Sequence, residues 1–165
     1  MHARPREGRD SDPRWLAAAP SSRVTQVLGK SIVLVEDEDE MRLMLERYLT
    51  RAGWRPASFA RVSEAVAWLG LSLADGSLAR LPALIVSDVR LPELSGLDLL
   101  EILACSTRKI PTILITAFPT SELRESALQR GAARVLEKPF DVPSLLGAID
   151  SVLGSAPSGE PGSDA

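Results

Sequence analysis

Acidic side chains follow two short apolar segments of this chain, and they are the residues best suited to chemistry. Asp88 comes just after the apolar run 83–86, and an acidic run at 36–40 follows the β-branched segment 31–35. Short apolar runs of this kind predict buried strands. Open α/β sheets bind ligands beyond the carboxyl ends of their strands, which is where these acids would lie. The ordinary alternative for Asp88 is a strand-end carboxylate that caps the next turn.

Two further predicted strand ends carry polar side chains, Thr116 and Lys138. In a parallel sheet all of these ends share one edge, so we expect the side chains to converge. Convergence of the acids is unfavourable, because two like charges about 4 Å apart repel by roughly 4 kcal/mol at an effective dielectric of 20. A cation or raised pKa values must offset this repulsion.

The donor types indicate which cation would fit. Oxygen ligands without histidine or cysteine favour a hard metal ion, Mg²⁺ before Zn²⁺. Mg²⁺ held by few carboxylates keeps positions open for phosphate oxygens, and Thr116 and Lys138 could hold the remaining ones. Such a set suits phosphoryl transfer, which depends on positioning and charge neutralisation. In isolation, Thr116 would be an ordinary β-branched strand residue and Lys138 a solvated loop charge.

The histidine and cysteine content excludes several other mechanisms. The single histidine is His2, so we expect no Ser-His-Asp triad, Cys-His pair or histidine metal site in the folded part. The single cysteine, Cys105, allows no internal disulfide and no cysteine zinc cluster. Its helical, apolar setting predicts a buried thiol and not a nucleophile.

Length and composition are those of an ordinary globular domain. The 165 residues predict one domain with room for tails, and 45% are hydrophobic and 25% charged. A formal net charge of −3 argues against a broad nucleic-acid surface, so we expect no direct DNA binding. No apolar run reaches the length of a membrane span and no signal-peptide pattern is present, so we expect a cytoplasmic protein without membrane insertion.

Strand and helix patterns alternate five times along the chain. Apolar and β-branched runs predict strands at 31–35, 55–59, 83–86, 112–117 and 134–136. Apolar spacing and cap residues predict helices at about 41–53, 63–70, 95–103, 121–131 and 141–153. A connection at 70–81 is longer than such a unit needs. The alternation predicts an α/β fold, a doubly wound, five-stranded parallel sheet with helices on both faces.

Four segments resemble the receiver domains of response regulators in two-component signalling, the CheY-like domains. The segments are Ile32–Glu38, Val86–Pro92 with Ser95-Gly96, Ile115–Ala117 and Glu137–Phe140. The resemblance covers about residues 30–153 and implies the flavodoxin-like strand order 2-1-3-4-5. Residues 1–29 are predicted to be a flexible N-terminal extension and 154–165 a disordered tail.

The resemblance implies a role for each acid. Asp88 would accept a phosphoryl group from a sensor histidine kinase or a phosphotransfer protein. The Mg²⁺ ligands would be Asp37, Asp88, the Arg90 carbonyl, and Glu36 directly or through water. The chain would then be a signalling domain and not an enzyme, beyond catalysing its own phosphorylation and dephosphorylation.

The resemblance also implies a switch. Thr116 would bond a phosphoryl oxygen and reorient, and Lys138 would pair with the phosphoryl group, with a cis Lys138-Pro139 bond. Val135 is a departure, because many receivers carry Tyr or Phe there and the ring turns inward on phosphorylation. We therefore expect output to run through the backbone of residues 116–123.

About a dozen residues follow the last predicted helix, too few for an output domain, so we expect a stand-alone receiver that binds an unknown downstream protein or relays phosphoryl groups.

Three alternatives remain. Val135 leaves open a pseudo-receiver, an interaction module that is never phosphorylated. A haloacid-dehalogenase-like phosphatase would need a second Asp where Arg90 stands. A nucleotide-binding domain would need a Gly-x-Gly turn after the first strand, where this chain is acidic.

Overall fold

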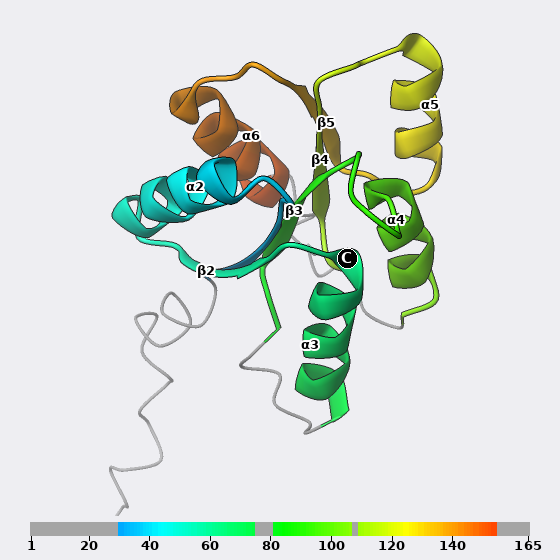
Figure 1. Cartoon of the computed structure of the whole chain (residues 1–165), viewed down its shortest axis with the longest axis horizontal. Coiled ribbons are helices and arrows are strands. Elements are labelled where there is room, and N and C mark those ends of the chain that lie inside the picture. Colours follow the sequence, from blue (N-terminus) through cyan, green and yellow to red (C-terminus); the bar gives the residue numbers. More distant parts are fainter. Residues whose placement is uncertain (1–29, 75–80, 107–108, 155–165) are drawn as a thin grey trace, which may run out of the picture.

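The computed structural model describes residues 30–74, 81–106 and 109–154. Strands and helices alternate within these ranges (Figure 1). The strands are β1 (Ser31–Val35), β2 (Arg55–Phe59), β3 (Leu84–Asp88), β4 (Thr112–Thr116) and β5 (Arg134–Glu137). The helices are α2 (Asp39–Arg51), α3 (Val62–Ala74), α4 (Gly96–Ala104), α5 (Ser121–Gln129) and α6 (Val142–Gly154).

All five strands are parallel and form one sheet in the order β2-β1-β3-β4-β5. This confirms both the doubly wound fold and the strand order. Each connection between successive strands contains a helix, as parallel pairing requires. In the register, Asp88 pairs with Ile115 and Thr116 pairs with Glu137. The carboxyl ends of the central strands therefore lie level with one another at one edge of the sheet.

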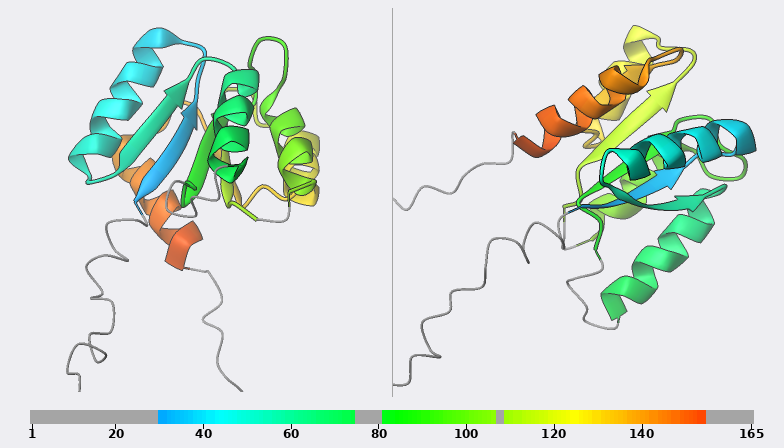
Figure 2. Two further views of the ribbon diagram at one scale, coloured as in Figure 1. Left: turned by 90° about the horizontal axis from the view of Figure 1, so that it is seen from below. Right: turned by 90° about the vertical axis from the view of Figure 1, so that its left-hand side faces the viewer.

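Helices cover both faces of the sheet. Alternate side chains of β1 point to opposite faces, so that Ile32 and Leu34 pack with α2 and α6 while Val33 and Val35 pack with α3 and α4. A third cluster joins Leu114 to α4 and α5. Figure 1 shows α2 and α6 on one side of the sheet and α3, α4 and α5 on the other, and Figure 2 gives two further views.

The central strands β3 and β4 are buried along their whole length. A strand covered on both faces needs apolar residues at successive positions, which explains the unbroken apolar runs in the sequence. The polar residues that end these two strands, Asp88 and Thr116, are buried as well. Buried polar groups of this kind are held by hydrogen bonds, and the partners of both side chains define the site described below.

Two predictions at the periphery are wrong. Helix α3 continues to Ala74, so the connection predicted at 70–81 begins inside the helix. One glycine costs a helix only about 1 kcal/mol relative to alanine, and the apolar pattern continues beyond it. Cys105 is exposed and not buried, because it caps the end of α4 beyond the turns that bury Leu99 and Leu100.

The predicted extension at 1–29 lies outside the described residues. So does the predicted tail at 154–165, apart from Gly154, which is the last residue of α6. Among the helices that the structure describes, none is both long enough and apolar enough to cross a bilayer.

Candidate functional site

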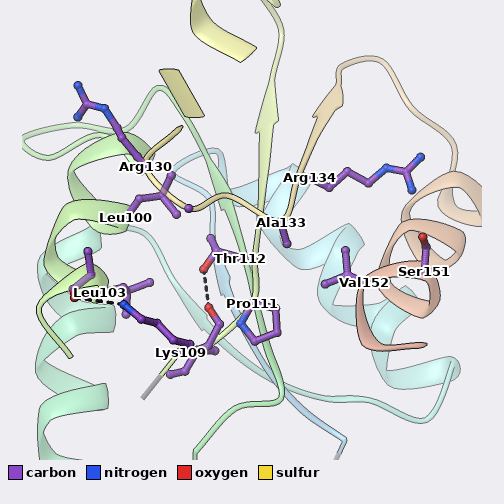
Figure 3. Close-up of a pocket in the computed structure, with 13 residues that line it drawn as sticks. Leu100, Leu103, Lys109, Pro111, Thr112, Arg130, Ala133, Arg134, Ser151 and Val152 are labelled. Carbon is purple, nitrogen blue, oxygen red and sulfur yellow. Dashed lines mark hydrogen bonds between the residues drawn. The ribbon is translucent and has the colours of Figure 1, made fainter. Parts of the chain in front are cut away.

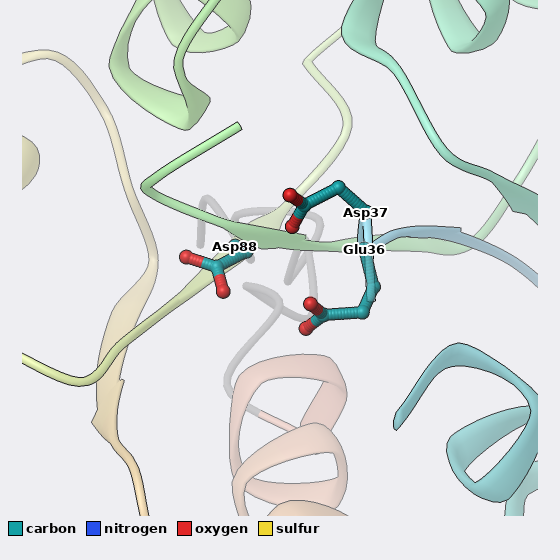
Figure 4. Close-up of side chains that lie close together, drawn as sticks. All are labelled: Glu36, Asp37 and Asp88. Atoms are coloured by element: carbon teal, nitrogen blue, oxygen red, sulfur yellow. The ribbon is translucent and has the colours of Figure 1, made fainter. Parts of the chain in front are cut away.

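The three acids predicted to converge lie together at the carboxyl edge of the sheet. Glu36 and Asp37 follow β1 directly and Asp88 ends β3. Each offers a carboxylate oxygen, and these oxygens lie within 4.8 Å of one another; Figure 4 shows the Glu36 and Asp37 side chains extending toward Asp88. Glu36 and Asp88 are buried, whereas Asp37 is exposed. The site is therefore open to solvent on the Asp37 side, where an ion or phosphoryl group can enter.

Lys138, which follows β5, completes this acidic cluster. Its ammonium nitrogen lies 2.5 Å from Asp88 Oδ2 and 2.8 Å from Glu36 Oε2. Burial alone would lower the pKa of Lys138, but the hydrogen bonds to Asp88 and Glu36, together with both carboxylate charges, outweigh burial and raise it. The raised pKa favours the charged form of Lys138 beside the Asp88 carboxylate. The Lys138-Pro139 bond is cis, as expected.

The raised pKa of Glu36 reflects the unfavourable burial of these charges close together. The Glu36 side chain is only 2% exposed. Burial is the largest influence and raises the pKa of Glu36, whereas the hydrogen bond and the charge of Lys138 lower it. The nearby Asp88 carboxylate raises it further, and the pKa of Glu36 is raised overall. Lys138 alone therefore does not fully offset the burial of the Glu36 charge and its repulsion by Asp88. A divalent cation would stabilise the same carboxylates, and their all-oxygen donor set fits Mg²⁺.

Asp88 is fixed by its neighbours on both sides along the chain. The Arg90 backbone N–H donates a hydrogen bond to Asp88 Oδ1 at 2.8 Å. The backbone of Asp88 is approached closely by Gly96 at the start of α4, where a Cβ atom would lie 2.4 Å from the Asp88 carbonyl oxygen. The Gly96 N–H also donates to the Val89 carbonyl at 3.0 Å. Only glycine lets α4 begin this close to the backbone of Asp88.

Thr116 lies at the same edge of the sheet, and its hydroxyl is bound by a backbone N–H of the loop that follows β4. Its Oγ1 accepts a hydrogen bond from the Phe118 N–H at 3.1 Å, and its carbonyl accepts one from the Lys138 N–H at 2.8 Å. The hydroxyl residue is therefore tied through the backbone to the lysine that binds Asp88. Val135, the predicted departure, is half-buried and packs in the third cluster with Leu97 and Leu123.

Two positioning features were not predicted from sequence. Arg42 of α2 reaches back to the acidic loop, where its Nη1 donates to the Glu36 carbonyl at 2.8 Å. Ser95 and Asp98 form a capping box at the start of α4, and the bonds from the Ser95 hydroxyl and backbone N–H lower the pKa of Asp98. The Ser-x-x-Asp pattern signals the box in sequence, whereas nothing local signals the contact of Arg42.

A groove of about 540 Å³ lies elsewhere, at the opposite edge of the sheet. It is lined by the first residues of β4 and β5 together with α4 and α6, including Thr112, Arg134 and Val152 (Figure 3). None of the acidic residues of the cluster lines it. The groove is therefore separate from the chemistry at the carboxyl edge.

Comparison with known proteins agrees with the receiver-domain resemblance of the sequence. The family model described as the response regulator receiver domain matches residues 32–150. The chain is 34% identical over 131 residues to the polar-differentiation response regulator DivK of Brucella ovis, a match covering 78% of this chain and 100% of that protein. It is 29% identical over 123 residues to the DNA-binding transcriptional regulator NtrC of Proteus hauseri, covering 74% of this chain but 24% of that protein.

The fold comparison agrees. The signal receiver domain of a signal transduction histidine kinase from Syntrophus aciditrophicus superposes with a TM-score of 0.67 at 27% identity, covering 83% of this chain and 99% of that chain. The chain spans about a quarter of the length of its NtrC relatives. Receiver domains are signalling modules of two-component systems. The family model, the strand order and the acidic edge of the sheet agree, and this chain belongs to the response regulator receiver domains of two-component systems.

Proposed function

We propose that Asp88 of this chain accepts a phosphoryl group from a phosphohistidine on a histidine kinase or a phosphotransfer protein. The observation that carries the proposal is the position of Lys138, whose ammonium contacts the Asp88 carboxylate. A cation fixed at this carboxylate would pair with the oxygens of an incoming phosphoryl group. Phosphoryl transfer requires little more from a protein than such positioning and charge stabilisation.

Mg²⁺ would be held by Asp37, Asp88, the Arg90 carbonyl, and Glu36 directly or through water. When bound, Mg²⁺ supplies positive charge that neutralises the carboxylates and the oxygens of the phosphoryl group. The clustering of three carboxylates with a raised pKa at Glu36 supports this ligand set. Arg42 holds the backbone of the loop that carries Glu36 and so orients two of the ligands.

In the transfer step, one Asp88 carboxylate oxygen forms a bond to phosphorus while the bond from phosphorus to the donor's imidazole nitrogen breaks. The nitrogen keeps the electron pair of that bond. Lys138 would stay with the phosphoryl oxygens, and the Thr116 hydroxyl would turn to donate to one of them. Thr116 is already linked to Lys138 through the backbone hydrogen bond between them, which supports their acting together.

We propose further that the domain acts as a stand-alone receiver, binding a downstream protein or passing the phosphoryl group on. The similarity to DivK supports this, because that relative is matched over its full length by a receiver-sized segment. The shift that follows phosphorylation would pass through the backbone from Thr116 to Leu123, since Val135 has no ring to turn inward. Amide exchange that stayed unchanged across this segment on adding a phosphoryl mimic would contradict that route.

The proposal is tested by labelling with acetyl phosphate. The wild-type chain should gain an acid-labile acyl phosphate when Mg²⁺ is present and none when it is chelated. Asp88→Asn should abolish labelling. Asp150→Asn is the matched control, because Asp150 lies exposed in the second half of α6 and is not a member of the acidic cluster. Labelling of Asp88→Asn at the wild-type level would refute the assignment of the acceptor.

Val135 favours a second candidate, a pseudo-receiver that binds proteins without being phosphorylated. Valine removes the aromatic partner that many receivers use to couple the hydroxyl residue to the surface. The contact between Lys138 and Asp88 argues against this candidate, since a binding module has no need of it. A pseudo-receiver should show no Mg²⁺ binding in a calorimetric titration, whereas a phosphorylated receiver should bind the ion.

A further inference from the structure

Two loops at the carboxyl edge hold the acceptor and the hydroxyl residue in the same way. The N–H of Arg90 donates to Asp88 Oδ1 at 2.8 Å, and the N–H of Phe118 donates to Thr116 Oγ1 at 3.1 Å. In each case the donor lies two residues after the side chain that it holds. The backbone N–H groups of Arg90 and Phe118 therefore help to set the orientations of the Asp88 and Thr116 side chains.

The side chains of these same two residues meet across the site. The central carbon of the Arg90 guanidinium lies 4.1 Å from the centroid of the Phe118 ring, within the range of a cation–π contact. In the part of the chain that the structure describes, Arg90 forms no salt bridge. Phe118 is 58% exposed, so core packing does not hold its ring. The contact with Arg90 is therefore the interaction that the described part of the chain shows for the Phe118 ring.

We propose that the Arg90–Phe118 contact is a positioning element that holds Thr116 in its present orientation and so opposes phosphoryl binding at Asp88. The inference rests on the proposed function. Thr116 must turn its hydroxyl toward a phosphoryl oxygen, and the Phe118 N–H holds that hydroxyl where it is. Arg90 anchors Phe118, so the loop after β4 moves only when the stacked pair separates.

The Arg90–Phe118 contact gains importance because Val135 has no aromatic ring. Val135 pairs with Leu114 in the sheet and packs into an apolar cluster, so it brings no ring to the loop after β4. The ring of Phe118 stands in that loop instead and connects it to the loop after β3. Coupling between Asp88 and Thr116 would then run through the contact between the loops after β3 and β4, and not through an aromatic ring on β5.

The test is a double-mutant cycle on the full chain, with beryllofluoride and Mg²⁺ as the phosphoryl mimic. The variants are Arg90→Met, Phe118→Leu and the double variant, and the dissociation constant is measured by calorimetry. Phe118→Leu should tighten binding about two- to fivefold, the strength of a cation–π contact at an exposed site. In the Arg90→Met background it should have no effect. The cycle cancels the loss of the arginine charge itself.

A second measurement separates positioning from general loosening. Arg90→Met should speed amide hydrogen exchange at Phe118 in the free protein. It should leave exchange unchanged at Leu123, whose N–H donates to Thr120 Oγ1 at the same 3.1 Å in the next turn of chain. Both substituted side chains are exposed, so the variants should fold.

Each outcome decides a separate question. Equal effects of Phe118→Leu in both backgrounds, or weaker binding of the mimic by Phe118→Leu, would overturn the inference while leaving the proposed function intact. Equal acceleration of exchange at Phe118 and Leu123 would overturn it as well. A wild-type chain that does not bind beryllofluoride would overturn the proposed function itself.

Discussion

Lys138 lies with its ammonium nitrogen 2.5 Å from the carboxylate of Asp88, although fifty positions separate them along the chain. The same nitrogen also binds Glu36 from a third strand end. This lysine therefore joins β1, β3 and β5 at the edge of the sheet where we propose that the phosphoryl group binds. Its replacement should affect stability as well as phosphoryl binding, and the two effects can be measured separately.

Lys138→Met should lower the free energy of unfolding by about 2 kcal/mol at neutral pH without divalent ions. Losing one partner of a buried pair costs more, about 3–5 kcal/mol, but Lys138 keeps some contact with solvent. Urea denaturation gives the value. Lys109→Met is the control, because Lys109 is exposed and its ammonium donates to the Ala104 carbonyl, a contact whose loss should cost less than about 0.5 kcal/mol. Equal costs for the two variants would contradict the prediction.

Glu36→Gln should make the protein more stable near neutral pH in EDTA. The pKa of Glu36 in the folded state is raised above its ordinary 4.5, so the native state binds more protons than the unfolded state. Stability therefore falls as pH rises from about 4.5 through the native pKa, and glutamine removes that loss. The gain should vanish below about pH 4.5, as denaturation at several pH values would reveal. Glu125→Gln, exposed on α5, is the control and should change the free energy of unfolding by less than about 0.5 kcal/mol.

Mg²⁺ should stabilise the folded domain, and Asp37→Asn should remove this response. At a free Mg²⁺ concentration about a hundred times the dissociation constant, binding adds about 2.7 kcal/mol to the free energy of unfolding. Asp37 is exposed, so its replacement should leave the stability in EDTA unchanged. Thermal melts with and without Mg²⁺ measure both quantities. Glu40→Gln, in the first turn of α2, is the control and should keep the full response.

Gly96→Ala should destabilise the domain by about 2–3 kcal/mol, as overpacking does, and should weaken phosphorylation by displacing Asp88. The added Cβ would lie 2.4 Å from the Asp88 carbonyl oxygen, and backbone cannot yield cheaply. Gly70→Ala is the matched control, since among the described residues no atom other than the adjoining backbone of α3 lies within 4 Å of its Cβ position. It should be neutral or stabilising by up to about 1 kcal/mol. If both variants have wild-type stability, the close approach at Gly96 is not tight.

Much of the site could be predicted from the chain alone. The acids at 36 and 37, Asp88 and Lys138 each follow an apolar run, and a parallel sheet brings such positions to one edge. The prediction for Cys105 failed, because local apolar spacing does not show where a helix leaves the core. The predicted roles of the Arg90 carbonyl and of Mg²⁺ remain predictions.

The sequence by itself determined the elements, their order and the residue types at the strand ends, because hydrophobic period and turn residues act over short distances. Only the tertiary structure decided which groups contact which. Lys138 is shared between Asp88 and Glu36, Arg42 holds the acidic loop, and Arg90 stacks on Phe118. Each of these contacts depends on side-chain orientation and on the register between strands, which packing of the whole domain sets and no local pattern encodes.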